Sequence, residues 1–473
     1  MGLKLDAATP PGAASDARPT VEALRRSFDK RLTAPVSFRR EQLRALGRAI
    51  ESREQDLLDA LHEDLRKPPM EAYASELGFV QSDIAHTLRH LDRWTRPRRA
   101  STPLVAWPGR SRVMPEPFGV ALIVGPWNYP FQLLLSPLVA ALAAGNVACL
   151  KPSELAPNTS ATVARLVRDT FAPDYVAVVE GGQVVSEALL HERFDYIFFT
   201  GSTTVGRAVM RAAAEHLTPV TLELGGKSPC IVCADADLEV SARRIVWGKF
   251  MNAGQTCVAP DFILADRRIK APLLEAIQRA IRQFYGDSPR DSADYGRIVN
   301  DRHFARIVGY LPQGRIVQGG DHDVRDRFIA PTVMVDVDPA APVMREEIFG
   351  PVLPVLEFEE IEDALALLRD RPKPLALYLF TRDRAVEEIV SAQTSSGGMC
   401  VNDVISHMLG KDVPFGGVGE SGMGAYHGKA GFDTFTHYKP VLRRAWTPDF
   451  SLRYPPFKLS RRWLKFIYNW LMG

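Results

Sequence analysis

The stretch GVALIVGPWNYPFQLLLSPLVAALAAGNVACLKPSE, residues 119–154, decides the fold of this chain. It holds two short apolar runs, GVALIV and NVACLK, on either side of a helical segment that begins near Leu133. Short apolar runs bounded by turn residues indicate buried strands. No charged residue lies between Glu116 and Lys151, but the segment is interrupted by Pro126, Pro130 and Pro137. A membrane-spanning helix is therefore not expected here.

The alternation of strand and helix continues downstream of this stretch. A helix is expected from Thr159, then the strands YVAVVEG and YIFFTG, a helix from Thr204 and the strand VTLELG. Helices between successive strands imply an α/β fold with a parallel, doubly wound sheet. A second α/β region begins near Cys230 with CIVCADAD and a helix from Leu238, and it continues to about Val401.

The residues upstream have a helical period. From Val21 to about Arg93 apolar residues recur at helical spacing with charges on the opposite face, which predicts a run of amphipathic helices. Residues 95–112 lack this period and contain several prolines, so they suit an extended connection or a protruding hairpin. Residues 1–20 have no apolar run, and we interpret them as a flexible leader rather than a secretory signal.

Length and composition narrow the class of protein. A chain of 473 residues, 46% of them hydrophobic, is too long for one compact core, so two or three domains are expected. A formal charge of +2 gives no global electrostatic reason to bind nucleic acid. Five cysteines are an odd number, which argues against a disulfide framework and for a reducing compartment. We therefore expect a cytoplasmic protein, with peripheral membrane association as the alternative.

Two residues carry candidate chemistry. NAGQTCVAP places Cys257 after a Gly-Gln-Thr turn, and LELGGKSP places Glu223 at the end of a strand. A positioned thiol with a nearby carboxylate can act as a covalent catalyst. A single cysteine is more often a small buried apolar residue, so neither residue identifies the chemistry alone.

Two further patterns need a structural context. GSTTVG, residues 201–206, differs from the G-x-G-x-x-G fingerprint, but it follows a strand and opens a helix whose N–H groups could meet a phosphate. Cys230 and Cys233 have a CxxC spacing without a second Cys or His pair. Because a zinc site needs such a second pair, no metal is predicted.

Seven motifs, in this order, resemble the aldehyde dehydrogenase superfamily from about residue 21 to 440. They are GPWNYP (125–130), KPSE (151–154), FTGSTTVG (199–206), LELGGKSP (222–229), GQTC (254–257), EEIFGPV (346–352) and PFGGVGESGMG (414–424). GQTCVAPDFIL, the segment PFGGVGESGMGAYHGK followed by FDTFTH, and RYPP resemble the class 3 branch, which includes the fatty aldehyde dehydrogenases. The resemblance implies the aldehyde dehydrogenase fold: a cofactor domain with a doubly wound parallel sheet, an α/β catalytic domain and small bridging arms.

The resemblance also implies the catalytic roles. Cys257 would attack the aldehyde carbon to form a thiohemiacetal. Asn128 and the backbone N–H of Cys257 would hold the developing oxyanion. After hydride transfer a thioester remains, and Glu223 would activate the water that hydrolyses it to a carboxylate.

The same resemblance implies a dinucleotide site. Lys151 and Glu154 would lie near the adenosine ribose, and Glu347 and Phe349 would contact the nicotinamide ribose and ring. Other cofactor contacts are expected at Val124, Pro126, Trp127, Gly201, Ser202, Val205, Gly206, Leu224 and Gly225. A carboxylate such as Glu154 can bond a ribose 2′-hydroxyl and would repel a 2′-phosphate. NAD is therefore expected, with NADP as the alternative because the class 3 branch often accepts both.

The same resemblance implies domain boundaries and a partner subunit. We expect a leader at 1–20, a cofactor domain at 21–94 and 113–222, a catalytic domain at 223–405, bridging segments at 95–112 and 406–440, and a C-terminal tail at 441–473. Class 3 relatives are dimers, so a homodimer bridged by 95–112 and 425–440 is expected.

The expected substrate depends on the residues that precede Cys257 in the sequence. Four residues recur at helical spacing: Trp247, Phe250, Met251 and Gly254. They could line an apolar tunnel for the aldehyde, or they could pack in the core. The class 3 resemblance favours the tunnel for Trp247, and with it medium or long aliphatic or aromatic aldehydes. A CoA-acylating semialdehyde dehydrogenase is the alternative of the same fold, and Glu223 argues against it because transfer to a thiol needs no hydrolytic base. An inactive membrane-tethered scaffold is a remote alternative.

The tail carries a concentrated positive charge. Residues 441–473 hold seven Lys or Arg against one Asp. In KLSRRWLKFIYNWLMG, Trp463, Ile467, Trp470 and Leu471 share one helical face with cations nearby. The segment is too short and too charged to span a bilayer. It could bind a membrane surface or pack on the enzyme body or a partner subunit, and some fatty aldehyde dehydrogenases have a membrane-anchoring tail.

Overall fold

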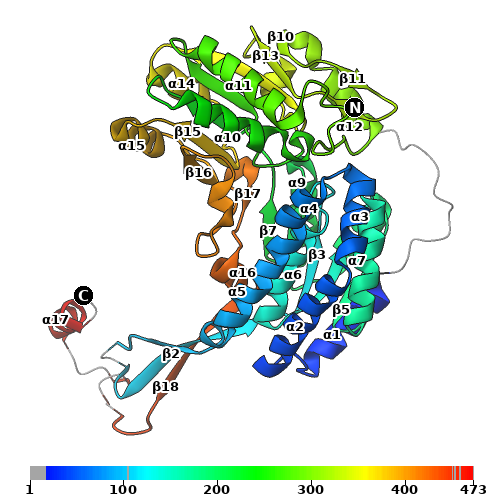
Figure 1. Ribbon diagram of the computed structural model, residues 1–473. Coiled ribbons are helices and arrows are strands. Elements are labelled where there is room, and N and C mark those ends of the chain that lie inside the picture. Colours follow the sequence, from blue (N-terminus) through cyan, green and yellow to red (C-terminus); the bar gives the residue numbers. More distant parts are fainter. Residues whose placement is uncertain (1–16, 104–105, 450, 452–453, 457–459, 472–473) are drawn as a thin grey trace.

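The computed structural model describes residues 17–103, 106–449, 451, 454–456 and 460–471. Figure 1 shows two α/β bodies, one above the other, and a long arm of strands that extends from the lower one. This arrangement agrees with the predicted α/β architecture and with more than one domain.

A six-stranded sheet forms the centre of the lower body, in the order β17-β7-β6-β3-β4-β5. Its strands are parallel except β17, which runs antiparallel to β7. The strands are β3 (Val120–Val124), β4 (Val147–Lys151), β5 (Val176–Val178), β6 (Tyr196–Thr200), β7 (Val220–Glu223) and β17 (Gly422–Met423). In this register Val124 pairs with Lys151, and Thr200 pairs with Glu223. The strand ends that carry the site motifs therefore lie along one edge of the sheet.

Helices cover this sheet. They are α1 (Arg18–Asp29), α2 (Val36–Ser52), α3 (Glu54–Leu65), α4 (Pro69–Ala72), the π-helical turn η1 (Tyr73–Leu77), α5 (Gly78–Trp94), α6 (Gln132–Ala144), α7 (Pro157–Thr170), α8 (Gln183–His191), α9 (Thr203–Ala214) and α16 (Gly428–Thr434). Every residue of α6 is buried, because it packs against β3 and β4 and against α2, α5 and α16. This packing explains the uninterrupted apolar run of the deciding stretch.

Two details of the lower body differ from the sequence prediction. The helix α1 begins at Arg18 with Pro19 in its first turn, so residues 18–20 are helical and not part of a flexible leader. Proline suits this position because its missing N–H would have no helical partner there. Residues 1–16 lie outside the described residues. The helix α8 stands between β5 and β6, where two consecutive strands were predicted.

A seven-stranded sheet forms the upper body, in the order β10-β13-β14-β9-β8-β15-β16. All neighbouring strands are parallel except β10 and β13. The strands are β8 (Pro229–Val232), β9 (Phe262–Asp266), β10 (Arg315–Gln318), β13 (Thr332–Val335), β14 (Val352–Phe358), β15 (Ala376–Phe380) and β16 (Gly398–Val401). The second predicted α/β region, from Cys230 to Val401, is thus a sheet of its own.

The upper body is completed by helices and a small hairpin. Its helices are α10 (Leu238–Phe250), η3 (Met251–Gly254), α11 (Lys270–Tyr285), α12 (Asp301–Val308), η4 (Leu311–Gln313), α13 (Pro342–Arg345), α14 (Ile361–Arg369) and α15 (Arg384–Gln393). The short strands β11 (His322–Asp323) and β12 (Phe328–Ile329) pair with each other. The turns η5 (Ser406–Leu409) and η6 (Gly419–Ser421) lie in the chain that returns to the lower body.

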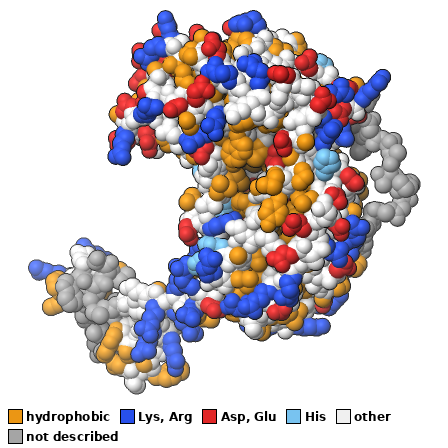
Figure 2. All heavy atoms as spheres, viewed as in Figure 1, with side chains coloured by type: hydrophobic (Ala, Val, Ile, Leu, Met, Phe, Trp, Pro, Cys, Tyr) orange, Lys and Arg blue, Asp and Glu red, His pale blue; other side chains and the backbone are white. Residues whose placement is uncertain are grey.

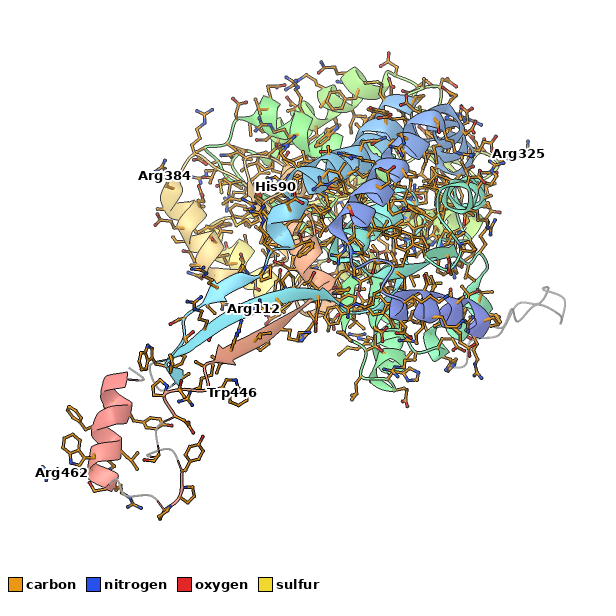
Figure 3. All side chains as sticks on the ribbon, turned by 90° about the horizontal axis from the view of Figure 1, so that it is seen from below. His90, Arg112, Arg325, Arg384, Trp446 and Arg462 are labelled. Carbon is orange, nitrogen blue, oxygen red and sulfur yellow. The ribbon has the colours of Figure 1, made fainter. Side chains whose placement is uncertain are left out.

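The arm is an antiparallel sheet of β1 (Arg98–Ala100), β2 (Gly109–Pro117) and β18 (Thr436–Arg444). It includes part of the predicted extended segment 95–112. Because β18 continues to Arg444, residues 441–444 belong to the arm, and the C-terminal tail begins after them. Figure 3 shows α17 (Arg461–Leu471) beyond the tip of the arm, away from both bodies. Within the described residues no helix is long and apolar enough to cross a membrane.

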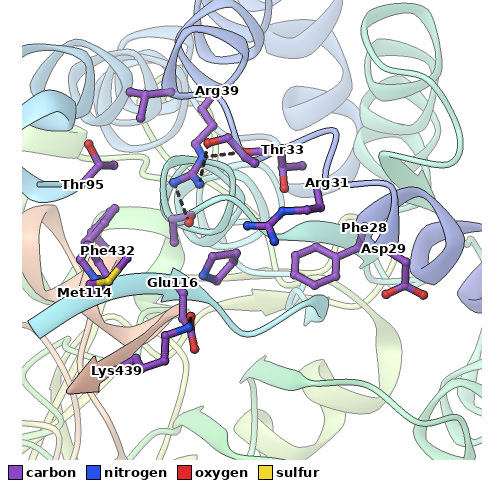
Figure 4. A pocket seen from close by; sticks show the side chains of 15 residues that line it. Phe28, Asp29, Arg31, Thr33, Arg39, Thr95, Met114, Glu116, Phe432 and Lys439 are labelled. Atoms are coloured by element: carbon purple, nitrogen blue, oxygen red, sulfur yellow. Dashed lines mark hydrogen bonds and ion pairs between the residues drawn. The ribbon is translucent and has the colours of Figure 1, made fainter. Parts of the chain in front are cut away.

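A cavity of about 580 Å³ lies where the arm meets the lower body. Figure 4 shows Arg39 in its wall, with hydrogen bonds to backbone carbonyls. The Arg39 guanidinium donates to Thr33 O at 2.7 Å and to Ala144 O, at the end of α6, at 2.8 Å. Burial lowers the pKa of Arg39 to about 10. Arg39 therefore satisfies the carbonyls at the end of α6 and joins that helix to the loop before α2.

Candidate active site

Cys257 follows a strained turn that ends α10. Within η3, Asn252 and Ala253 both have φ 51°, a left-handed conformation that is rare outside glycine. The Gln255 side chain holds this turn, since its amide donates to Asn252 O at 3.0 Å and to Arg297 O at 2.9 Å. Strain of this kind persists where the surrounding structure over-determines the backbone. The position of the Cys257 thiol is therefore fixed by buried hydrogen bonds.

Glu223 is the last residue of β7 and its side chain is buried. Neither carboxylate oxygen has a hydrogen-bond partner within the described residues. Burial therefore raises the pKa of Glu223 well above its usual value. A carboxyl group in this state has a much stronger affinity for a proton than one in water.

Asn128 lies in the loop between β3 and α6. Its side-chain amide donates to Gln255 O at 3.0 Å, so it reaches the turn that carries Cys257. An amide has two N–H donors, and this bond uses one of them. Asn128, Glu223 and Cys257 line one cavity of about 230 Å³. The structure thus brings all three predicted catalytic residues together.

The thiol of Cys257 has a perturbed acidity. Burial, with smaller contributions from the carboxyl groups of Glu347 and Glu223, raises its pKa to about 12. The backbone at Cys257 and Val258 opposes this shift.

The predicted cofactor residues fall into two groups. The first lines the cavity that holds Cys257: Pro126, Trp127, Gly201, Ser202, Leu224, Gly225, Glu347 and Phe349. The second does not line it: Val124 and Lys151 end β3 and β4, Glu154 follows β4, and Val205 and Gly206 lie in the first turn of α9. In this second group Lys151 pairs with Glu154 at 3.0 Å. The two groups together trace an extended edge, which suits an elongated ligand.

The segment 346–349 is held firmly beside the thiol. Arg306 donates to Glu347 O at 3.2 Å and to Ile348 O at 2.8 Å. A Cβ on Gly225 would lie 2.1 Å from a Glu347 oxygen, so glycine is required for this close approach. Burial raises the pKa of Glu347 to about 8. The Phe349 ring meets Trp127 edge to face at 5.3 Å between centroids.

The residues fit a dinucleotide. The first turn of α9 presents backbone N–H groups at the sheet edge, and the Ser202 side chain accepts a hydrogen bond from Val205 N at 3.4 Å. A helix N-terminus with open donors is suited to a phosphate. Gly206 lies so close to Leu224 that a Cβ would come within 2.7 Å of it, which brings α9 against the end of β7. Glu154, paired with Lys151, and Glu347, beside Gly225, add carboxyl groups that can accept hydrogen bonds from hydroxyl groups.

A second, larger cavity of about 700 Å³ meets the first at the thiol. Cys257, Leu133, Phe415 and Tyr426 line both. The residues that recur at helical spacing before the thiol were expected either to line an apolar tunnel or to pack in the core. Trp247 and Met251 line this larger cavity, whereas Phe250 is buried in the core. Figure 2 shows hydrophobic side chains gathered in the hollow between the two bodies.

Several residues of the site were not predicted. Phe415 and Tyr426 lie within the motif region 414–429, but that motif gave them no role. His303 and Arg306, on α12, lie outside every motif, so no sequence signal marked them. Glu71, which lines the larger cavity, accepts a hydrogen bond from Asn252 N at 2.8 Å, and burial raises its pKa to about 7.

The CxxC pair does not resemble a metal site. Cys230 lies in β8, Cys233 directly follows that strand, and both are free and buried. Among the described residues no group of three or more His, Cys, Asp or Glu side chains could hold a metal ion.

Comparisons with known proteins cover most of the chain. Residues 6–441 match the model of the Aldehyde dehydrogenase family. The 4,4'-diaponeurosporen-aldehyde dehydrogenase of Staphylococcus aureus is 46% identical over 93% of this chain and 96% of that protein. Aldehyde dehydrogenase family 3 member A2 of Rattus norvegicus is 47% identical over 94% and 93%.

Two more comparisons concern assembly and fold. The dimeric NADP-preferring aldehyde dehydrogenase of Canis lupus familiaris is 46% identical over 92% of this chain and 97% of that protein. The substrate-bound structure of Staphylococcus aureus AldH is 44% identical, covers 95% of this chain and 99% of that chain, and has a TM-score of 0.94. The aldehyde dehydrogenase fold and the likeness to class 3 are thus confirmed.

The acidity of Cys257 predicts its reactivity. Because its pKa is raised to about 12, iodoacetamide labelling of the cofactor-free protein should accelerate about tenfold per pH unit from pH 7 to 9, as the thiolate fraction does. Peptide mass spectrometry after timed quenching measures the rate at Cys257 separately from the other cysteines. A labelling rate that is flat over this range would show that the thiol is already ionised at neutral pH.

Proposed function

Because this chain belongs to the aldehyde dehydrogenase family and oxidises aldehydes with NAD(P) as its cofactor, we propose that Cys257, Asn128 and Glu223 carry the reaction. The observation that supports this assignment is the position of the thiol. Cys257 stands where an apolar cavity and a cavity lined by cofactor residues meet, with Glu223 and Asn128 in the same wall. A nucleophile at such a junction can contact an aldehyde on one side and a dinucleotide on the other.

The first step is attack of the Cys257 sulfur, as a thiolate after the thiol has lost its proton, on the aldehyde carbon. The carbonyl oxygen gains negative charge as the thiohemiacetal forms. The free N–H of the Asn128 amide and the backbone N–H of Cys257 are proposed to donate to this oxygen. Loss of one such donor raises a barrier by roughly 2.7–4 kcal/mol, so Asn128 accounts for a substantial part of the rate.

NAD(P), when bound, accepts the hydride that converts the thiohemiacetal to a thioester. The residues proposed to hold it are Val124, Pro126, Trp127, Lys151, Glu154, Gly201, Ser202, Val205, Gly206, Leu224, Gly225, Glu347 and Phe349. Glu154 is 44% exposed and would favour a ribose 2′-hydroxyl over a 2′-phosphate, which supports NAD as the preferred form.

Glu223 is proposed as the general base of the last step. Its carboxylate would take a proton from water as the oxygen attacks the thioester carbon, and the Cys257 sulfur leaves as the acid forms. The raised pKa of Glu223 strengthens it as a base, provided that it is ionised when water arrives. A hydrolytic base also distinguishes this reaction from transfer of the acyl group to CoA.

We propose medium or long aliphatic or aromatic aldehydes as substrates. The larger cavity has a predominantly apolar wall, and Met70 and Trp247 in this wall are 80% and 42% exposed. An apolar chain could therefore enter without meeting a charged barrier at these residues. The Staphylococcus aureus relative is named for a long apolar aldehyde, which supports the same class.

The Glu223 role predicts a defined kinetic defect. Glu223→Gln should still give one rapid equivalent of NADH per site and then turn over slowly, because the thioester forms but hydrolysis lacks its base. Stopped-flow absorbance at 340 nm separates the burst from the steady state. Cys257→Ala is the control and should abolish both phases while NAD affinity stays nearly unchanged. Rapid multiple turnover in Glu223→Gln would place the base elsewhere.

A homodimer is proposed, bridged by segments 95–112 and 425–440. The canine relative is named as dimeric, and the sheet of the arm ends in β1 and β18, whose outer edges have no partner strand within the described chain. Multi-angle light scattering at micromolar concentration should give twice the mass of 52.4 kDa. A monomer under these conditions would refute this assembly.

Peripheral membrane contact is proposed for the tail. In α17 the side chains of Trp463, Leu464, Phe466 and Tyr468 are exposed, and Trp463 packs edge to face on Phe466 at 5.9 Å. Apolar burial of about 1.5–3 kcal/mol per side chain and roughly 1 kcal/mol per nearby cation could hold the helix at an anionic surface.

Co-sedimentation with anionic liposomes at low salt tests the tail. The full-length protein should pellet with the vesicles, and a chain truncated after Pro456 should stay in the supernatant. High salt should weaken binding by screening the cations. Equal recovery of both forms in the supernatant would show that the tail is a packing element of the enzyme or of its partner subunit.

A further inference from the structure

We propose that the buried ion pair between Lys67 and Glu76 is a positioning device for the oxyanion-stabilising amide of Asn128. This inference rests on the role proposed for Asn128. Neither Lys67 nor Glu76 lines the two cavities that meet at Cys257, so neither is placed to touch the aldehyde or the cofactor. They are positioning residues, which act through the loop between β3 and α6.

Lys67 binds the segment 128–132, which ends this loop and begins α6, at its first residue. Its Nζ donates to Asn128 O at 3.1 Å and to a Glu76 oxygen at 2.5 Å. Both side chains of the ion pair are completely buried. The Tyr129 ring lies against the same ammonium, 4.0 Å from its centroid. The cation is therefore enclosed by the residues whose position it would determine.

Glu76 binds the other end of the loop. Its second oxygen accepts from Phe131 N at 3.0 Å and from Gln132 N at 2.9 Å. These are the cap and first residue of α6, where a carboxylate complements the open N–H groups and the helix dipole. Lys67 and Glu76 therefore bind the backbone of residues 128–132 at both ends, and the ion pair links these two sets of hydrogen bonds.

The carbonyl of Asn128 receives a second donor from the nucleophile's side. Asn252 Nδ2 donates to Asn128 O at 2.8 Å and to Gln255 O at 3.2 Å. The Asn128 amide in turn donates to Gln255 O. Hydrogen bonds thus fix the position of the loop relative to both the ion pair and the turn before Cys257. A shift at Lys67 would move the oxyanion donor relative to the sulfur.

The chemistry of the pair favours a positioning role over simple stabilisation. Burying two charges incurs a desolvation penalty that their attraction often only offsets, and apolar residues of similar volume are frequently as stabilising. Here each charge makes hydrogen bonds to the same short loop, which an apolar pair could not make. Glu76 lies in η1, and π-helical turns of this kind occur frequently at functional sites.

A double-mutant cycle tests the inference. The paired substitution Lys67→Met with Glu76→Gln removes both charges together, so no single buried charge is left without a partner. It is made in the wild-type chain and in Asn128→Ala, and the rate of the NADH burst is measured in all four proteins. We expect the pair to slow the burst about tenfold or more in the wild-type chain and less than about twofold in Asn128→Ala, because the amide that it positions is then absent.

Lys67→Arg, in the same two backgrounds, keeps the charge and gives the same test if the neutral pair does not fold. Its wider guanidinium should displace Asn128 O and slow the burst severalfold only where Asn128 is present. Arg25→Met with Asp195→Asn is the matched control. This partly buried pair, at 2.9 Å, lies at the amino ends of the strands and should leave the burst unchanged.

The possible outcomes separate the two proposals. Equal slowing in both backgrounds would mean that Lys67 and Glu76 only stabilise the fold, and the inference would be overturned while the role of Asn128 stands. An unchanged burst in Asn128→Ala would remove the proposed role of Asn128 and the inference with it. Nicotinamide cofactor affinity, measured by fluorescence titration, should stay within about twofold throughout, because the ion pair acts on the oxyanion donor.

Discussion

The parallel register of the six-stranded sheet is the constraint on which the site depends. Because β3, β4, β6 and β7 run in the same direction, their carboxyl ends meet at one edge, with Val124 beside Lys151 and Thr200 beside Glu223. Ligand sites in open α/β sheets form at this edge. The second sheet then needs to supply only the thiol and the segment around Glu347 to complete the site. A change of register in the first sheet would separate Glu223, the proposed base, from Asn128, the proposed oxyanion donor.

Burial has the same effect on three groups of the site. Glu223, Glu347 and Cys257 all have raised pKa values, and exclusion from water is the largest cause for each. The environment that discourages their charges also strengthens any hydrogen bond made to an oxyanion there. The proposed nucleophile is therefore a thiol at neutral pH, while the proposed oxyanion donors are already in place. Such an arrangement suits a reaction in which the negative charge on the substrate oxygen develops only during the reaction.

Much of the fold and the residues that gather at the candidate site could be predicted from the sequence, because apolar runs and ordered motifs are local signals. The strands β3, β4, β6 and β7 and all three catalytic candidates were found in this way. The helix α8 was missed because it is short and only one of its residues is fully buried, so its pattern is weak. His303 and Arg306 reach the site from a distant helix, and only tertiary packing reveals them. Lys67 and Glu76 look like ordinary surface charges in an amphipathic segment, and their burial could not be read from spacing.

The meeting of two cavities at one sulfur has a consequence for the divergence of related enzymes. The walls of the larger cavity come from the region of α4 and η1, from α10 and α11, and from residues near 405–415, whereas the cofactor residues lie on strand ends and in the loop around Glu347. Apart from a few shared residues, such as Leu133, Phe415 and Tyr426, the two linings are different parts of the chain. Mutations that reshape the larger lining can thus accumulate with little change in the redox half of the enzyme. Substrate specificity can therefore evolve largely independently of cofactor binding.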